Sequence, residues 1–220
     1  MKKTSSLFLA LGIILTTGFA GFVRNAAALS ETSLAVAVRV YNHVEADPKT
    51  LTEAEKVATE IMRKAGVETR WLNPDLGSLH QQQSSPEATS VTLPILNVHI
   101  VSRATAELFG LPVYSLGVSP GTGRNRQHGY VFYDRVEVLA KKQLMAWVVR
   151  SVPFYATRDQ ILGHAMAHEM GHLLGLDSHS ATGIMRGDWG LDDLANARIG
   201  RLLFTRQQAE VIRSEARNRQ

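Results

Sequence analysis

The amino-acid sequence predicts one α+β domain in which a mixed sheet packs against several helices. Segments of alternating polarity, typical of strands, dominate the earlier part of the chain. Apolar residues at helical spacing, preceded by capping residues, lie between these segments and dominate the later part. The 220 residues are 45% hydrophobic and 20% charged, which suits a globular domain with a sizeable core.

The N-terminal residues have the order of a secretory signal peptide. Two lysines precede an apolar run over 7–23, and Ala26-Ala27-Ala28 supplies an A-x-A cleavage signal. We therefore expect 1–28 to be a signal peptide and 29–220 to be the mature domain, secreted or periplasmic, with no membrane association after cleavage. An uncleaved membrane anchor and cleavage at Ala20 are the alternatives.

The composition excludes several classes of function. Cysteine is absent, so disulfide scaffolds, thiolate metal sites and cysteine nucleophiles are ruled out. A transition-metal site must therefore use His, Asp, Glu or water. The formal charge of +4 reflects the leader, because Lys2, Lys3 and Arg24 lie there and the remaining 21 basic residues nearly balance 20 acidic ones. We expect no nucleic-acid partner.

The first predicted unit is strand, helix, strand. Positions 34–44 alternate in polarity as a strand does, and a helix is predicted after Asp47, with Thr50 or Thr52 as its cap. A second strand at 67–72 completes the unit. Because a helix connects the two strands, we expect them to pair in parallel through a right-handed crossover.

Strands and loops alternate up to about residue 138, after which helices dominate. Two late helices each begin with a threonine followed three residues later by glutamine, at Thr157 and Thr205, which is the capping-box pattern. We expect loops at 73–92 and 119–128, strands at 93–101, 113–118 and 129–138, and helices at 103–109, 137–150, 157–174 and from 205 onward.

The stretch with candidate metal-binding and catalytic residues lies inside one of these well-capped helices. His168-Glu169-x-x-His172 places two imidazoles four residues apart, on one helix face. Both can reach a single zinc ion at ~2.0–2.1 Å, and Glu169 projects beside them as a general base. Gly175 can end the helix and turn the chain back, and His179 follows within that turn.

This stretch resembles the metzincin zinc peptidases, whose pattern is H-E-x-x-H-x-x-G-x-x-H followed by a methionine turn. The wording G-L-D-S-H-S is similar to the matrixin branch. The resemblance implies a single-domain metzincin-like fold, with a mixed twisted sheet packed against the zinc-binding helix, and Zn²⁺ as the cofactor. It assigns zinc ligands to His168, His172 and His179, the general base to Glu169, the turn glycine to Gly175 and the methionine beneath the metal to Met185.

Two departures from the family pattern leave alternatives open. The family spacing places the third ligand at Ser178, so His179 needs a one-residue bulge to reach the ion. The matrixin tyrosine after the methionine has no counterpart, because Met185 is followed by Arg186. His164, one turn before the motif, is expected to pack rather than to bind metal. The alternative third ligands are acids: Asp177, Asp192 and Asp193, although Asp192 is first expected to cap a helix.

These features predict an exported zinc-dependent endopeptidase. It would hydrolyse peptide bonds of a peptide or protein substrate with a zinc-activated water and Glu169 as base. In the resembling family the substrate lies along an edge strand, and the strand at 129–138 is the expected one, with Tyr130, Phe132 and Tyr133 beside the substrate. The alternative is a zinc-binding, non-catalytic module with a degraded peptidase site. The oligomeric state stays open.

Overall fold

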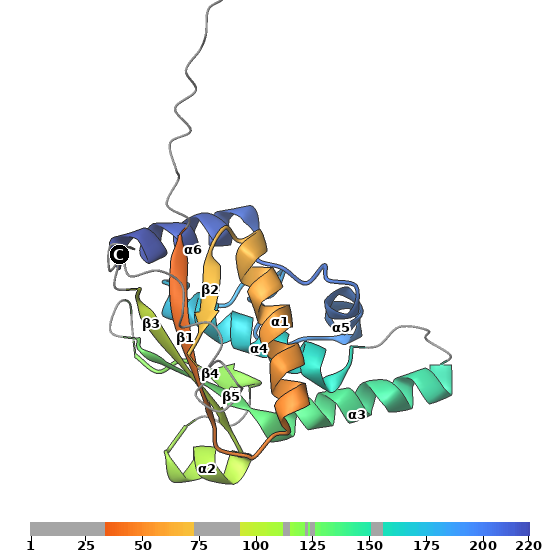
Figure 1. Ribbon diagram of the computed structural model, residues 1–220. Helices are drawn as coiled ribbons and strands as arrows, with labels where there is room; N and C mark the ends of the chain where they lie inside the picture. Colours follow the sequence, from red (N-terminus) through yellow and green to blue (C-terminus); the bar gives the residue numbers. More distant parts are fainter. Residues whose placement is uncertain (1–33, 73–92, 112–114, 122, 124–125, 151–155) are drawn as a thin grey trace, which may run out of the picture. The chain divides into compact units, whose positions relative to one another are not determined.

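The computed structural model describes residues 34–72, 93–111, 115–121, 123, 126–150 and 156–220 (Figure 1). The proposed signal peptide and the loop predicted at 73–92 lie outside the described residues, so both stay predictions. The chain from Ser33 to Gln220 forms one compact unit. No helix among the described residues is long and apolar enough to cross a membrane.

The architecture is a five-stranded mixed sheet with helices, as the sequence predicts. Its strands are β1 (Ala35–Asn42), β2 (Glu68–Trp71), β3 (Ile95–Val101), β4 (Gly117–Val118) and β5 (His128–Phe132). They lie in the order β2-β1-β3-β5-β4. The first three neighbouring pairs are parallel and β4 runs antiparallel to β5. The parallel pairing of β1 with β2 confirms the first predicted unit.

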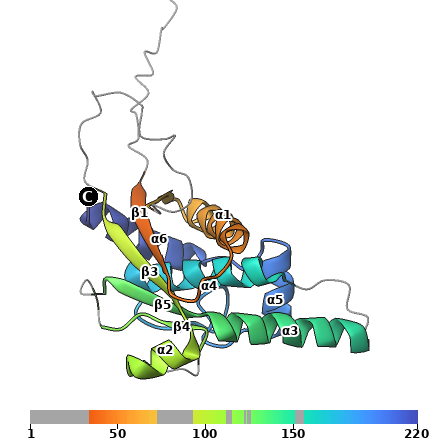
Figure 2. The ribbon, with the colours of Figure 1, turned by 60° about the horizontal axis from the view of Figure 1, so that its bottom comes forward.

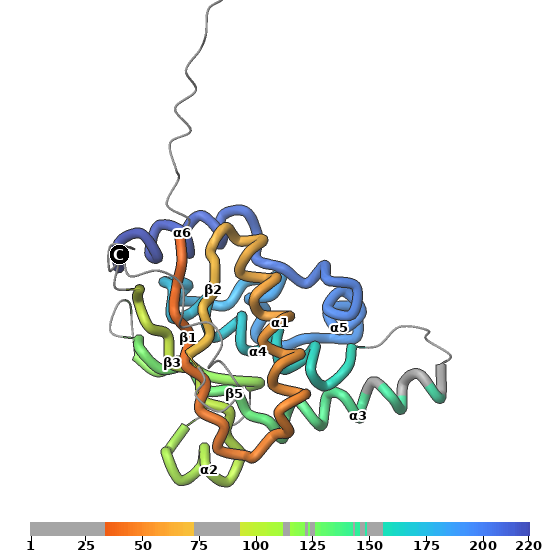
Figure 3. The backbone as a smooth tube through the Cα atoms, viewed as in Figure 1, coloured from red at the N-terminus to blue at the C-terminus, as the bar shows by residue number. Residues whose placement is uncertain are grey.

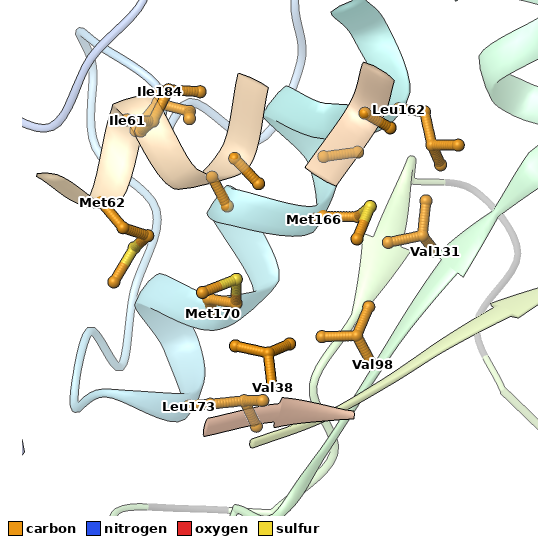
Figure 4. Close-up of a cluster of buried hydrophobic side chains, with 14 of the residues drawn as sticks. Val38, Ile61, Met62, Val98, Val131, Leu162, Met166, Met170, Leu173 and Ile184 are labelled. Atoms are coloured by element: carbon orange, nitrogen blue, oxygen red, sulfur yellow. The ribbon is translucent and has the colours of Figure 1, made fainter. Parts of the chain in front are cut away.

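Two helices pack together against one face of the sheet (Figure 2). They are α1 (Pro48–Lys64) and α4 (Arg158–Leu173). Val98 and Val131 of the sheet face Met166 and Met170 of α4 in a buried apolar cluster (Figure 4). This packing fixes the helix that carries the His-Glu motif against the sheet.

The remaining helices surround this core. The short α2 (Arg103–Leu108) buries Ala106 in a second small cluster against β3 and β5. The long α3 (Tyr133–Arg150) follows β5 directly, and α5 (Leu191–Arg198) follows the loop beyond α4. The last helix, α6 (Arg206–Asn218), returns the chain to the start of β1, where the Gln220 side chain donates to the Ala35 carbonyl at 3.1 Å (Figure 3).

The capping boxes predicted for α4 and α6 are confirmed, whereas the cap predicted for α1 is wrong. Capping boxes at Thr157 and Thr205 begin α4 and α6. For α1 the prediction is wrong, because Asp47 is the cap and its carboxylate accepts from the Thr50 amide at 2.9 Å. Pro48 occupies the first helical turn, a position that needs no amide hydrogen, so the helix begins earlier than Thr50.

The prediction of an edge strand at 129–138 is wrong in both the length of the strand and its place in the sheet. It ends at Phe132, and α3 begins at Tyr133, four residues before the predicted helix start. Asp134 lies in the first helical turn, where a carboxylate is favourable, and it accepts from the Arg103 amide. Because β5 lies between β3 and β4, Tyr130 and Phe132 belong to an inner strand. The sheet edge on this side is β4.

Candidate metal centre

Three histidines meet at the C-terminal half of α4. His168 and His172 project from one face of this helix and are 8% and 7% exposed, whereas His179 comes from the following loop and is exposed. One ring nitrogen from each lies within 4.8 Å of the other two. His179 lies equally far from both partners, with ring centroids 5.2 Å apart.

Backbone carbonyls orient the two helical imidazoles. Nδ1 of His168 lies 2.7 Å from the Ile184 carbonyl, and Nδ1 of His172 contacts the Leu176 carbonyl. A carbonyl can only accept, so each Nδ1 donates and each Nε2 keeps its lone pair. Burial lowers the pKa of His168 to about 3 and also lowers that of His172, which keeps both rings neutral. Such oriented, neutral rings are the form that binds metal.

The turn after α4 brings His179 close to the two helical histidines. Gly175 has φ of +91°, in the left-handed region that glycine adopts freely, and it reverses the chain where the sequence predicts a turn. Gly187 supports the ring of His179 from the other side. A Cβ atom at this glycine would lie only 3.0 Å from Nδ1 of His179. The chain therefore accommodates the extra residue relative to the family spacing.

The alternative acidic ligands have other partners. Asp177 pairs with Arg126 at 2.9 Å and is not among the grouped ligand atoms. Asp193 pairs with Arg186 at 2.8 Å and accepts from the amide that precedes α5 at 2.9 Å. Asp193 thus caps α5, and the expectation that Asp192 caps this helix is wrong. The arrangement favours His179 as the third ligand.

Glu169 lies beside the histidines, buried between α4 and the edge of the sheet. Its side chain is 2% exposed, and Oγ of Ser119 donates to its Oε2 at 2.7 Å. Burial raises the pKa of Glu169 to about 8, against the lowering effects of Ser119 and of the charge on Arg126. Gly117 makes room for the carboxylate, because a Cβ atom there would lie 2.5 Å from Oε1.

A pocket joins these groups to solvent. Its walls include His168 and His179 of the cluster, the carboxylate of Glu169, and Gly117 of β4. Arg186 also lines the pocket, at the position where the matrixin pattern has its tyrosine. The pocket is therefore lined by two candidate metal ligands, a candidate general base and a residue of the edge strand β4.

Met185 and His164 flank the cluster without joining it. Met185 is fully buried against α4, where a Cβ atom at Gly171 would lie 3.0 Å from its sulfur. His164 is 2% exposed, and its Nδ1 donates to the Gln160 carbonyl at 2.7 Å. Its ring meets Trp189 edge-on, so His164 packs, as expected from the sequence.

Ser119 and Arg126 are site residues that sequence reasoning missed. Both lie in the segment interpreted as a turn-rich loop, and both are buried. Arg126 donates to the Gly121 carbonyl and to Asp177, which fastens this loop to the turn after α4. The one signal in the sequence is a pair of arginines, at 124 and 126, in a loop of otherwise small and polar residues, and this signal does not indicate which of them is buried.

The donor set fits zinc. Three imidazole nitrogens, with an adjacent carboxylate that is not itself a ligand, match the ligand number and type of a catalytic zinc site that keeps one open position. The fold and this cluster together define a candidate metal centre, in which a helix packed against a mixed sheet supplies two of the three ligands.

Comparison with solved structures finds several similar chains. The chain is similar to archaemetzincin from Methanopyrus kandleri, with 12% sequence identity and a TM-score of 0.45, over 86% of this chain and 99% of that chain. No protein-family model and no curated protein matches the sequence.

Proposed function

We propose that this protein is an exported zinc-dependent endopeptidase of the metzincin type. The observation that carries the proposal is the grouping of His168, His172 and His179, two of which line one pocket together with the buried carboxylate of Glu169. The sequence motif supports it independently, because each of these residues lies where the resemblance places a functional group, with His179 one residue later than the family spacing.

The metal ligands, the base and its hydrogen-bonding partner would have different roles in the reaction. A zinc ion bound by the three histidines would supply Lewis-acid activation of water and of the peptide carbonyl. The positive charge of a bound ion would lower the pKa that burial raises in Glu169 and so favour its carboxylate form. In that form Glu169 accepts the proton of the attacking water and passes it to the leaving amine nitrogen. Ser119 holds one oxygen of this carboxylate, which leaves Oε1 on the side of Gly117 and the pocket.

The edge strand offers a place for an extended substrate. Among the described residues β4 pairs with a strand on one side only, so its other edge can meet a peptide strand, although the Gly117 carbonyl there already accepts from the Ser115 hydroxyl. Gly117 of β4 lines the same pocket as Glu169. We infer that a peptide substrate pairs with β4, which takes the role that the sequence suggested for 129–138.

Glu169→Gln is the decisive variant. We expect this variant and the unchanged protein each to bind one zinc per chain. The variant should lose about a thousandfold or more in the hydrolysis of a diverse peptide library, because the amide cannot accept the proton. Glu210→Gln, on the exposed face of α6, is the matched control and should keep full activity.

Two results would count against the proposal. Full activity in Glu169→Gln would show that Glu169 is not the general base. A zinc-loaded protein that cleaves no peptide in the library would favour the non-catalytic zinc module instead.

Export rests on the leader pattern alone, and N-terminal sequencing of the mature protein recovered outside the cytoplasm should read from residue 29.

A further inference from the structure

Three other histidines lie in a row on the sheet face that is turned away from α1 and α4. His43 follows β1, His99 lies in β3 and His128 begins β5. Nε2 of His43 lies 3.1 Å from Nδ1 of His99, and Nε2 of His99 lies 2.9 Å from Nδ1 of His128. The buried Val98 and Ile100 flank His99 in β3, so the alternation of the strand directs His99 away from the core.

Two tyrosines hold the central ring of this row. Tyr41 and Tyr130 are the register partners of His99 in the neighbouring strands. Both stack on it, with ring centroids 4.5 and 4.8 Å away and interplanar angles of 6° and 19°. A ring stacked between two others cannot swing freely about its side-chain torsions. The position of His99 is therefore set before any ligand arrives.

The row is accessible to solvent at two of its three rings. His43 and His128 are exposed, and His99 is partly buried. Burial, with smaller effects from the two neighbouring histidines, lowers the pKa of His99 to about 4, so its ring carries no charge that would repel a cation. If Nδ1 of His99 donates to His43, its Nε2 accepts the hydrogen bond of His128 Nδ1. Both facing nitrogens can bind an ion once the proton of His128 moves to its Nε2.

The spacing of the nitrogens indicates which ion would fit. With metal–nitrogen bonds of ~2.0–2.1 Å, two ligands at right angles lie about 2.9 Å apart, whereas tetrahedral ligands lie about 3.4 Å apart. Without a bound ion the 2.9 Å between Nε2 of His99 and Nδ1 of His128 is a hydrogen bond, and two ligand nitrogens at the same positions would suit the right-angled case. Tetragonal nitrogen and oxygen coordination is typical of Cu²⁺.

We propose that this sheet face holds a second metal site, for Cu²⁺, with Nε2 of His99 and Nδ1 of His128 as ligands and solvent in the remaining positions. His43 acts as a positioning residue that orients His99 through its other nitrogen, as hydrogen-bonded partners of metal-binding histidines commonly do. The site is separate from the cluster on α4 and does not depend on the proposed peptidase activity.

The test uses the full zinc-loaded protein, into which Cu²⁺ is titrated by equilibrium dialysis. We expect one copper to bind per chain with a Kd below about 10 µM, and its EPR spectrum to show coupling to two nitrogens. His99→Phe keeps the stacked ring between the tyrosines and removes both nitrogens, so it should weaken copper binding at least tenfold. His128→Gln should do the same, and His43→Gln should have a smaller effect.

A matched control separates the two metal sites. His179→Ala should lose zinc from the cluster on α4 and keep the copper site unchanged. The proposal is overturned if His99→Phe and His128→Gln both bind copper as tightly as the unchanged protein, or if the unchanged protein binds it only above about 100 µM. Because His128 is exposed, His128→Gln decides the matter even if His99→Phe fails to fold.

Discussion

Ser119 is the hydrogen-bonding partner that fixes one oxygen of the buried Glu169 carboxylate. A hydrogen bond to a charged group contributes about 1.5 kcal/mol or more, which corresponds to roughly tenfold in a rate. We expect Ser119→Ala to lower kcat about tenfold with little change in KM or zinc content, because the alanine leaves the carboxylate free to rotate. Steady-state kinetics on a peptide substrate and metal analysis would measure these quantities.

Ser214→Ala, at an exposed position on α6, is the matched control for this variant and should behave like the unchanged protein. A purely structural role for Ser119 would instead lower zinc content and activity in parallel. That outcome, or an unchanged kcat, would contradict the positioning role.

The residues of the metal cluster were predictable because local geometry brings most of them together. His168 and His172 share a helix face whatever the rest of the fold does, and Gly175 marks the turn that returns His179. Ser119 differs, because it meets Glu169 across 50 positions of sequence. That contact depends on how β4 lies against α4, which no local pattern encodes.

Among the elements, β4 is the one most sensitive to a change in side-chain size. A Cβ atom on Gly117 would lie 2.5 Å from both Oε1 of Glu169 and the Tyr130 carbonyl. We expect Gly117→Ala to lower the free energy of unfolding by about 1–3 kcal/mol and to reduce peptidase activity more than Ser119→Ala does, since it displaces the carboxylate. Urea titration and kinetics would measure both effects.

Gly190→Ala is the control for this prediction. A Cβ atom there would have a single neighbour, 3.9 Å away, and its φ of −85° suits any residue. It should leave stability and activity nearly unchanged. If Gly117→Ala were as active as Gly190→Ala, the close approach of β4 to Glu169 would be wrong.

Helix α4 also carries a group that couples its stability to pH. Burial lowers the pKa of His164 to about 4, from an ordinary value of 6.5. Between these two values the unfolded chain binds a proton that the folded protein does not, so stability rises with pH across this window and falls as the solution is acidified. From pH 7 to pH 5, His164 should remove about 2 kcal/mol from the free energy of unfolding.

His164→Leu should lose this part of the pH dependence. Urea titrations of the zinc-loaded unchanged protein and variant, at pH 7 and pH 5, would give the difference directly. Equal losses of stability in the two proteins would show that His164 is protonated as readily in the folded state as in the unfolded chain.

Element boundaries were less predictable than element types. The strand expected over 129–138 alternates in polarity beyond Phe132, yet the chain turns into α3 there. Asp134 explains the change, since its carboxylate reaches the Arg103 amide at the start of α2. This tertiary contact is invisible in the local pattern. The caps of α4 and α6 were predictable because a capping box lies within four residues.

At the scale of the whole molecule, the proposed zinc joins α4 to the loop that leads toward α5. Two ligands come from the helix and the third from the exposed His179, so a bound ion would cross-link α4 to this loop, in addition to the contacts of the buried Ile184 and Met185. A ligand that binds only the folded state stabilises it by about 2.7 kcal/mol when present at 100 times its Kd. For a domain of this size we expect chelation of zinc to lower Tm by about 5–11 °C.

Scanning calorimetry with and without a chelator would measure this shift, and two variants assign it to the ligands. His179→Ala should start near the Tm of the chelated protein and respond little to added zinc, because two imidazoles alone bind the ion weakly. Asp177→Asn should keep the full zinc-dependent shift, since this carboxylate pairs with Arg126 instead. The reverse pattern would make Asp177 the third ligand, and the turn after Gly175 would then present a different side chain to the metal.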